Sequence, residues 1–560
     1  MQYYLRHFSK LLEFVRNRYH DILTDTQLAH LNQFDNLSEE AQMLFVRLSG
    51  RVPTVFRIKN INYPEIENPT SALKELESAG LVSIIDNIAN KANIIRDIVT
   101  KKELKNFGWT TGVDPFVFIK NICEITPEVF QFILPLVSVE IKSFYQLLLF
   151  LYFANHHDGM EAFVLNEINN PPVPEVVISE RRLFESRQQL DDYLYSRDRY
   201  HQLRDSSSET TPDSITGIFL ETIQTLESIE FDLSDVLFRY RREYYLYKML
   251  LLCIDILVTN KKWLHEWTVR TDSLEYPDIF SGSYIELRRR IYLQDRRKVD
   301  LMRFISTFKN DRILSSDEKT IINSLERSVF KRPLPVTVFP SIDIRLPKPS
   351  GRKITRLEYQ ICGIEMNVEQ AVIHALKKEN FRAFHTENRL IPALGIAAFY
   401  KEIYAGIPGV FQSPFQQFPL DFHRDSFFSS RRELFEKRLF DLKDGFDFLP
   451  VNDLVLGLQK DLLEKAWSLL GAEKALRLIF KWLENPGQKS KGMPDIFAFN
   501  DDFCFFMEVK SPSDKLQKHQ IPWIEAIIDC GVCAFIGSVF HDQSMDAEAS
   551  IVRAEQLRSV

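Results

Sequence analysis

The stretch GMPDIFAFNDDFCFFMEVKSPSDK, residues 492–515, sets charged side chains among apolar ones. Its pattern predicts two core strands, DIFAFN and FCFFMEVK, separated by a short polar turn. Asp495, Glu508 and Lys510 stand on or beside these strands. A carboxylate that is buried without a partner loses its hydration at a large cost in free energy. The two acids therefore need a compensating group in the folded protein.

The spacing of these residues predicts that their side chains converge. Glu508 and Lys510 are two residues apart on one strand, so both point to the same face of the sheet. A hairpin-like return across NDD, residues 500–502, would bring Asp495 beside them. Converging carboxylates repel one another unless a cation lies between them, and hard oxygen ligands suit Mg²⁺ or Mn²⁺. The alternative is a surface hairpin with solvated charges, but FCFFMEVK is apolar on both faces, which favours a central strand.

The pattern Pro494-Asp495 followed by Glu508-x-Lys510 resembles the PD-(D/E)xK nuclease superfamily. Further residues resemble its VRR-NUC subgroup and, within that subgroup, the Fanconi-associated nuclease family, as a bacterial-type member. The matching residues are Gly492, Pro494, Asp495, Ile496, Glu508, Val509, Lys510, Pro512, Asp514, Leu516, Gln520 and Trp523.

This resemblance implies a metal-dependent, structure-specific DNA nuclease. Its substrates would be 5′ flaps and other branched DNA, cut as an endonuclease with 5′→3′ exonuclease activity, in repair of damage such as interstrand crosslinks. One or two Mg²⁺ or Mn²⁺ ions would be held by Asp495, Glu508, Glu387 and the carbonyl of Val509. Lys510 would position the attacking water or stabilise the transition state, and Gln520 would orient Lys510 or the phosphate.

Glu387 enters this set through the segment His385-Thr386-Glu387-Asn388, which resembles a His-x-Glu-Gly step of the family. Asn388 departs from the usual glycine, although asparagine tolerates a left-handed backbone better than most residues. The alternative for Glu387 is a helix-capping or surface residue.

The resemblance also implies a basic pocket for a 5′ phosphate in the helical region. Arginine suits phosphate through its planar fork of donors, and the alternative for most candidates is a solvated helix face. The candidates are Arg239, Arg241 and Arg242 in FRYRREYY, and Arg288, Arg289 and Arg290 in LRRRIYLQDRRK. The lysines that could contact the DNA backbone near the two strands are Lys489, Lys491, Lys515 and Lys518.

The chain as a whole is predicted to be mainly α and multidomain, with a C-terminal α/β PD-(D/E)xK nuclease domain around a mixed central sheet. Helical periodicity dominates the first part, and 76–165 is expected to be helical, with SFYQLLLFLYFA as a buried helix. Residues 330–353 are Pro-rich and basic, which predicts a linker with short extended pieces. The predicted regions are 1–75, winged-helix-like; 76–170, SAP-like and DNA-binding; 171–345, a TPR-like helical solenoid with the linker; and 346–560, the nuclease domain.

Composition narrows the class of protein. The net charge of −7 argues against a protein that coats polyanions non-specifically, but not against a local basic groove. Six dispersed cysteines fit a reducing compartment, and the apolar runs 147–154 and 249–258 are too short to span a bilayer. We expect a cytoplasmic, nucleoid-associated bacterial protein without a membrane partner. No phosphate-binding glycine loop with a lysine is present, so no nucleotide cofactor is expected.

Two other functions stay open at this point: a Holliday-junction-type resolvase, as in short VRR-NUC relatives, and a non-catalytic repair scaffold with a decayed nuclease fold. A repair-protein partner or a homodimer is also left open. Two further motifs are interpreted as structural. Cys530-x-x-Cys533 is expected to be a pair of small buried residues, and His156-His157-Asp158 a polar turn without metal.

Overall fold

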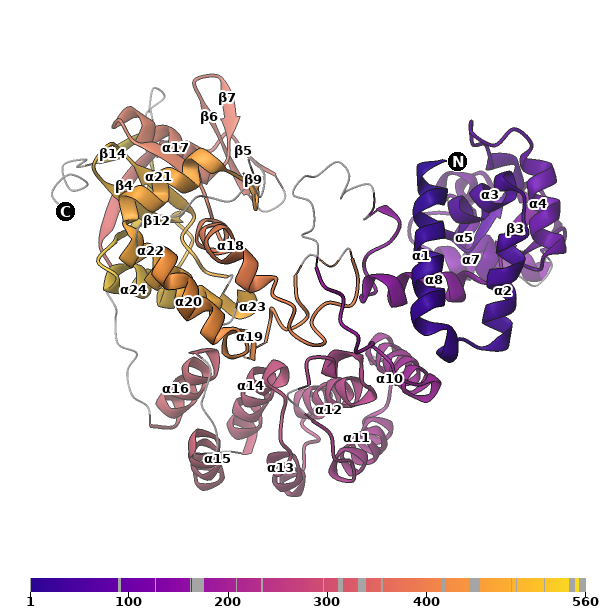
Figure 1. Ribbon diagram of the computed structural model, residues 1–560, viewed down its shortest axis with the longest axis horizontal. Coiled ribbons are helices and arrows are strands. Elements are labelled where there is room, and N and C mark those ends of the chain that lie inside the picture. Colours follow the sequence, from indigo (N-terminus) through magenta and orange to yellow (C-terminus); the bar gives the residue numbers. More distant parts are fainter. Residues whose placement is uncertain are drawn as a thin grey trace. The chain divides into compact units, whose positions relative to one another are not determined.

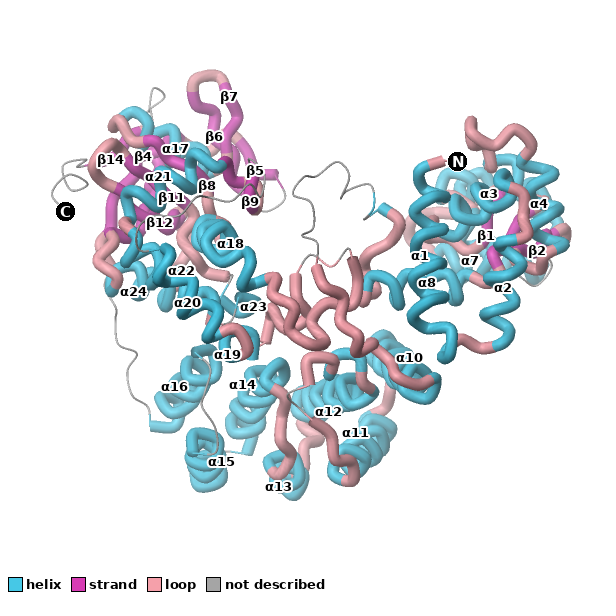
Figure 2. The backbone as a smooth tube through the Cα atoms, in the orientation of Figure 1, coloured by secondary structure: helices cyan, strands magenta, loops and turns pink. Residues whose placement is uncertain are grey.

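The structure is a computed structural model, and its helices and strands fall into two compact units (Figures 1 and 2). The first unit is Met1–Asn169, Ile178–Asp191 and Gln412–Gln417, and the second is Asn170–Val177, Asp192–Phe411 and Phe418–Val560. The residues described are 2–88, 92–125, 127–161, 163, 176–207, 209–232, 235–295, 297–310, 316–330, 339–353, 356–414, 416, 418–424, 426–442, 454–484, 486–489, 491–517, 519–542 and 549–552.

The first unit combines helices with a small antiparallel sheet of strand order β1-β3-β2. Local capping explains its helix starts: Ser38 accepts a hydrogen bond from the backbone of Ala41, and Asn68 from that of Ser71. Its elements are α1 (Tyr3–Tyr19), η1 (His20–Ile22), α2 (Asp25–Asp35), α3 (Glu39–Ser49), β1 (Val55–Arg57), η2 (Ile58–Asn60), α4 (Pro69–Ser78), β2 (Val82–Ile85), α5 (Ala92–Ile98), α6 (Lys101–Asn106), α7 (Pro115–Ile125), η3 (Pro127–Ile133), β3 (Leu136–Val139) and α8 (Lys142–Phe153).

Helix α8 is almost wholly buried, as its uniformly apolar sequence predicts. The expectation that 76–165 is helical throughout is wrong, because β2 and β3 lie within it. Strand β3 is the middle strand of the sheet and pairs with both β1 and β2. Four residues are too few to show a period, and the pairing partners of β3 lie far away in sequence.

The second unit begins with a run of helices, which confirms the helical character predicted for this region. Figure 1 shows these helices following one another in an arc from α10 to α16. Apolar side chains on neighbouring helices form one continuous core, which includes Phe219, Leu250 and Tyr284. The elements are α10 (Arg187–Asp205), α11 (Pro212–Glu227), η4 (Phe238–Tyr240), α12 (Arg242–Thr259), α13 (His265–Asp272), α14 (Asp278–Asp295), α15 (Lys298–Asn310) and α16 (Ser316–Phe330).

The remainder of the second unit is the expected α/β region. Its elements are β4 (Ser341–Pro347), β5 (Gly351–Lys353), β6 (Arg356–Ile361), β7 (Ile364–Met366), α17 (Val368–Lys378), β8 (Arg382–His385), α18 (Leu390–Ile403), α19 (Ser426–Ser429), α20 (Arg432–Leu442), β9 (Leu454–Val455), β10 (Leu458–Gln459), α21 (Lys460–Leu470), α22 (Ala472–Leu483), α23 (Pro486–Lys489), β11 (Ile496–Phe499), β12 (Cys504–Lys510), α24 (Ile521–Asp529), β13 (Cys533–Asp542) and β14 (Ser550–Val552).

A mixed sheet of strand order β14-β4-β13-β12-β11-β8 forms the centre of this region. Strand β12 runs parallel to β13 and antiparallel to β11, and every residue from Cys504 to Val509 is buried. One face packs on α17 through residues such as Val372 and Met507. The other face packs on α18, α21, α22 and α24 through residues such as Phe506 and Trp482. The prediction of a central strand rather than a solvated hairpin is therefore confirmed.

Strand β4 corrects one expectation. Residues 341–347 were expected to be part of a linker, but they form a strand between β13 and β14, and it crosses the predicted boundary at 345. Its side chains alternate between exposed and buried, as in a half-buried strand. The other domain boundaries remain predictions.

Two minor motifs can also be located. Cys530 and Cys533 are half-buried rather than buried, and both are free thiols. At the histidine motif, Asn155 accepts hydrogen bonds from the backbone of His157 and Asp158, which gives the expected polar turn. None of the described helices combines the length and the apolar character that a membrane span requires.

Candidate active site

The candidate site lies where β11 begins and β12 ends. Ile496 pairs with Met507 in the antiparallel register, so Asp495 stands beside Glu508. The backbone N–H of Val509 donates to Asp495 Oδ2 at 2.8 Å. The expected hairpin return is therefore confirmed. Gly492 precedes it with a φ of +84°, and a Cβ at that position would lie 2.3 Å from the carbonyl oxygen of His519. Only glycine fits there, because both the backbone and the available space exclude a side chain.

Glu508, Lys510 and Gln520 form a closed triangle of polar contacts. Lys510 Nζ donates to Glu508 Oε1 at 2.8 Å and to Gln520 Oε1 at 3.0 Å. Gln520 Nε2 donates to the same Glu508 oxygen at 2.5 Å. Gln520 is the residue before α24, so this helix start faces the end of β12. The predicted neighbours Asp495, Glu508, Lys510 and Gln520 are thus brought together.

Burial and the closeness of the two acids set the electrostatics of this site. Burial, reinforced by the negative charge of Glu508, raises the pKa of Asp495 to about 8, against the opposing hydrogen bond from Val509. Burial also raises the pKa of Glu508, although Lys510 opposes the shift. Glu508 is 1% exposed, and its Oε2 has no hydrogen-bond partner in the part of the chain that the structure describes. A buried, unsatisfied carboxylate oxygen beside a second acid fits a divalent cation.

Glu387 approaches the same acids from the turn after β8. Its negative charge contributes to the raised pKa of both Asp495 and Glu508. Asn388 adopts a φ of +56°, so asparagine does occupy the left-handed backbone expected at this position. Its Oδ1 accepts a hydrogen bond from the backbone of Met493 at 3.1 Å, which ties the turn to the loop before Asp495. The side chain of Glu387 is 48% exposed, and its Oε1 accepts a hydrogen bond from Asn388 Nδ2 at 3.1 Å.

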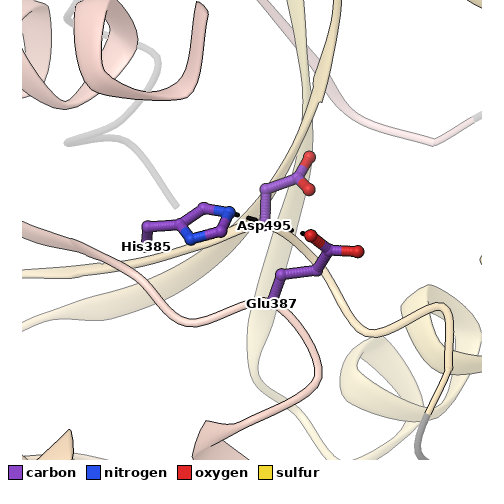
Figure 3. Close-up of side chains that lie close together, drawn as sticks. All are labelled: His385, Glu387 and Asp495. Carbon is purple, nitrogen blue, oxygen red and sulfur yellow. Dashed lines mark ion pairs between the residues drawn. The ribbon is translucent and has the colours of Figure 1, made fainter. Parts of the chain in front are cut away.

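His385 is a neighbour of this site that the sequence reasoning did not select. Possible ligand atoms of His385, Glu387 and Asp495 all lie within 4.8 Å of one another (Figure 3). The signal was present in the sequence, since His385 stands two residues before Glu387. What the sequence lacked was the pairing of β8 with β11, which places His385 opposite Ile496.

The six arginine candidates do not lie together. Arg288 is buried and bound to Asp272, Arg289 pairs with Glu286, and Arg290 pairs with Asp255. Near the start of α12, Arg241 lies 3.9 Å from Asp235 and Arg242 bonds Glu243. Arg239 differs, because its Nε is buried and has no hydrogen-bond partner among the described residues.

Arg239 stands among other cations. Burial lowers the pKa of Lys248, and the positive charges of Arg204 and Arg239 lower it further. Burial, and after it the charge of Arg239, also lowers the pKa of His423, although the residue as a whole is exposed. Lys248 and His423 were not selected from the sequence, because nothing in a single chain shows that they approach Arg239.

The four lysine candidates are only partly described. Lys491 and Lys515 are exposed. Lys489 ends helix α23, but its side chain lies outside what the structure describes, and Lys518 lies outside the described residues.

Comparisons with known proteins agree with this geometry. Residues 2–83 match the family described as "FAN1, HTH domain", and residues 441–540 match the "VRR-NUC domain". The Fanconi-associated nuclease 1 homolog of Pseudomonas aeruginosa is 24% identical over 565 residues, which cover 93% of each chain. The chain is therefore similar to Fanconi-associated nucleases over almost its whole length, and it contains a VRR-NUC domain. The human Fanconi-associated nuclease 1 is 27% identical over 209 residues, covering 33% of this chain and 20% of the human protein.

The fold of the chain is also found in a solved structure. A crystal structure of paFAN1 bound to 5′ flap DNA superposes with a TM-score of 0.72 at 22% identity, covering 97% of this chain and 98% of that one. These matches identify the chain as a structure-specific DNA nuclease, and the VRR-NUC domain implies that it depends on a divalent metal ion.

Proposed function

We propose that this nuclease hydrolyses DNA phosphodiester bonds at 5′ flaps and related branched DNA, as an endonuclease with 5′→3′ exonuclease activity. One observation carries the proposal: Asp495 and Glu508 meet at the end of β12, with Lys510 and Gln520 bound to Glu508. The substrate rests on the fold, which is shared with paFAN1 bound to 5′ flap DNA. Repair of interstrand crosslinks in a bacterial cytoplasm, close to the nucleoid, is the setting that this substrate favours.

Each residue of the site has a proposed role. Asp495, Glu508, Glu387 and the carbonyl of Val509 hold one or two Mg²⁺ or Mn²⁺ ions. A divalent ion at such a site supplies Lewis acidity toward the phosphate and lowers the pKa of the attacking water. Lys510 then offsets charge on the phosphate or orients that water, and Gln520 keeps the Lys510 ammonium in place.

Arg239 is the arginine that best supports a pocket for the 5′ phosphate. Lys248 Nζ lies over the ring of Tyr200, 4.5 Å from its centroid, and 5.4 Å from that of Tyr244. Each of these cations disfavours the charged form of its neighbours, so a bound anion would stabilise the group. We therefore assign the pocket to Arg239, Lys248 and His423. Arg241 and Arg242 follow Arg239 in sequence and lie next to acids of their own, and Arg288, Arg289 and Arg290 also bind acids of the helical region.

Lys491 and Lys515 are proposed to contact the DNA backbone, as are Lys489 and Lys518. Such contacts release counterions, so the affinity for flap DNA should fall as salt is added.

The function is tested with a panel of 5′ flap, 3′ flap, nicked and four-way-junction DNA in Mn²⁺, with and without a chelator. We expect the 5′ flap to be cut fastest and the chelator to abolish cutting. Asp495→Asn and Lys510→Met should each reduce the rate by at least about 100-fold. Asp501→Asn, in the exposed turn between β11 and β12, is the matched control and should cut normally.

Two outcomes would overturn the proposal. Fastest cutting of the four-way junction would favour the resolvase. Wild-type cutting by either active-site variant would remove these residues from the reaction.

A further inference from the structure

The imidazole of His385 lies at the edge of the acidic site. Its Nε2 is 3.8 Å from Glu387 Oε2, too long for a hydrogen bond, and Asp495 completes the group (Figure 3). The ring is 42% exposed, so packing does not explain its position. An exposed histidine near one acid is commonplace, but this one faces two acids of a metal site.

The backbone fixes His385 relative to Asp495. His385 pairs with Ile496 across β8 and β11. The next residue, Thr386, donates its backbone N–H to the carbonyl oxygen of Asp495 at 2.8 Å. The carbonyl of His385 accepts a hydrogen bond from Arg389 Nη2 at 2.6 Å. The imidazole therefore projects from a braced strand end rather than from an unsupported loop.

A second observation shows that the site is built for a ligand. Glu508 Oε2 is buried and has no hydrogen-bond partner among the described residues, and Glu508 faces both Asp495 and Glu387. A bound divalent cation would satisfy this oxygen and offset the cost of burying the charge.

We propose that His385 contributes an imidazole nitrogen to the divalent-metal site and so shifts its preference from Mg²⁺ toward first-row transition ions such as Mn²⁺. This inference rests on the proposed function and names a ligand of that same site. Mg²⁺ prefers oxygen ligands and retains its waters, whereas an imidazole nitrogen is a softer donor that suits transition ions.

Mn²⁺ is the probe for the direct test, because its unpaired electrons report on bound nitrogen. Pulsed electron paramagnetic resonance of the full chain with Mn²⁺ and no DNA should show coupling to a ¹⁴N nucleus. His385→Gln should lose this coupling. His374→Gln is the matched control, because His374 lies on α17 with its Nε2 4.0 Å from Cys362 Sγ, and it should keep the coupling.

Binding affinities give the second readout. In His385→Gln the affinity for Mn²⁺ should fall at least about tenfold, the lower end of what loss of an outer-shell partner costs. The affinity for Mg²⁺ should change much less, so the variant should prefer Mn²⁺ over Mg²⁺ less strongly than wild type does. A ¹⁴N signal that persists in His385→Gln, or equal losses for both ions, would overturn the inference.

The two proposals fail differently. If wild-type protein binds Mn²⁺ without nitrogen coupling yet cuts 5′ flaps, the His385 ligand is wrong and the nuclease assignment stands. If Mn²⁺ does not bind and no DNA is cut, both are wrong.

Discussion

At the scale of single residues, Gln520 holds two charged side chains at once. Its amide donates to Glu508 and accepts from Lys510, so it fixes the distance between an acid and a cation of the site. We expect Gln520→Leu to lower kcat for 5′ flap cleavage about 10–100-fold, the usual effect of losing a group that orients a metal ligand. The KM for the flap should change little, because Gln520 acts through its neighbours.

Single-turnover cleavage in Mn²⁺ measures this effect. Gln517→Leu is the control, since Gln517 contributes its backbone N–H to Gln520 and only its side chain would change. A loss that appears entirely in KM, or an equal loss in the control, would contradict a positioning role for Gln520.

The residues of the site differ in how far the sequence reveals them. Asp495, Glu508 and Lys510 lie on one hairpin, and local spacing is enough to predict that they meet. Gln520 and Glu387 needed the family resemblance, because they belong to other elements. His385, Lys248 and His423 were missed, since their neighbours in space lie on elements remote in sequence and a lone histidine or lysine carries no pattern.

At the scale of elements, the start of α6 depends on an ion pair with β1. Both guanidinium nitrogens of Arg57 donate to Glu103, at 2.6 and 2.9 Å. Glu103 also accepts from the backbone of Thr100, which completes a capping box. The Arg57 hydrogen bond, aided by Thr100, lowers the pKa of Glu103 from its ordinary 4.5 to about 2.

This shift predicts a pH-dependent contribution to stability. The folded pKa lies below the unfolded one, so the contribution is complete above 4.5 and is lost as pH falls through about 2. We expect Glu103→Gln to reduce the free energy of unfolding by about 0.5–1 kcal/mol at neutral pH, because the pair is partly exposed. The free energy of unfolding is measured by urea unfolding, and hydrogen exchange of peptides from α5 and α6 reports on this region directly. The values for wild type and variant should converge toward about pH 2. A gap that stays constant with pH would contradict this account.

Elements were predicted unevenly for a physical reason. Strands β11 and β12 are rich in apolar residues and form a hairpin, so sequence and local pairing agree. The side chains of β4 alternate between exposed and buried as expected for a strand, but prolines surround it. Its partner β13 follows almost 200 residues later. Strand formation depends more on partners than on propensity, and those partners are invisible in a short window.

At the scale of the whole molecule, the second unit carries both the acidic site and the cationic group of Arg239, Lys248 and His423. An enzyme that holds a 5′ phosphate away from its metal site selects DNA ends as well as branches. Wild type should prefer 5′-phosphorylated over 5′-hydroxyl flaps. We expect this preference to be about 10–100-fold smaller in the double variant Arg239→Gln, Lys248→Met. Hydrogen bonds to charged groups are worth about 1.5–3 kcal/mol, and about 1.4 kcal/mol is tenfold.

The ratio of kcat/KM for flaps with and without the 5′ phosphate measures this preference. Arg290→Gln is the control, because its guanidinium already bonds Asp255 and Thr259 and should leave the ratio unchanged. Added salt should lower this ratio of kcat/KM values more for wild type than for the double variant. Screening weakens a contact between charges, and the double variant has already lost that contact. If instead the control loses the preference and the double variant keeps it, the pocket lies on α14 and the arginines there must exchange their acids for phosphate.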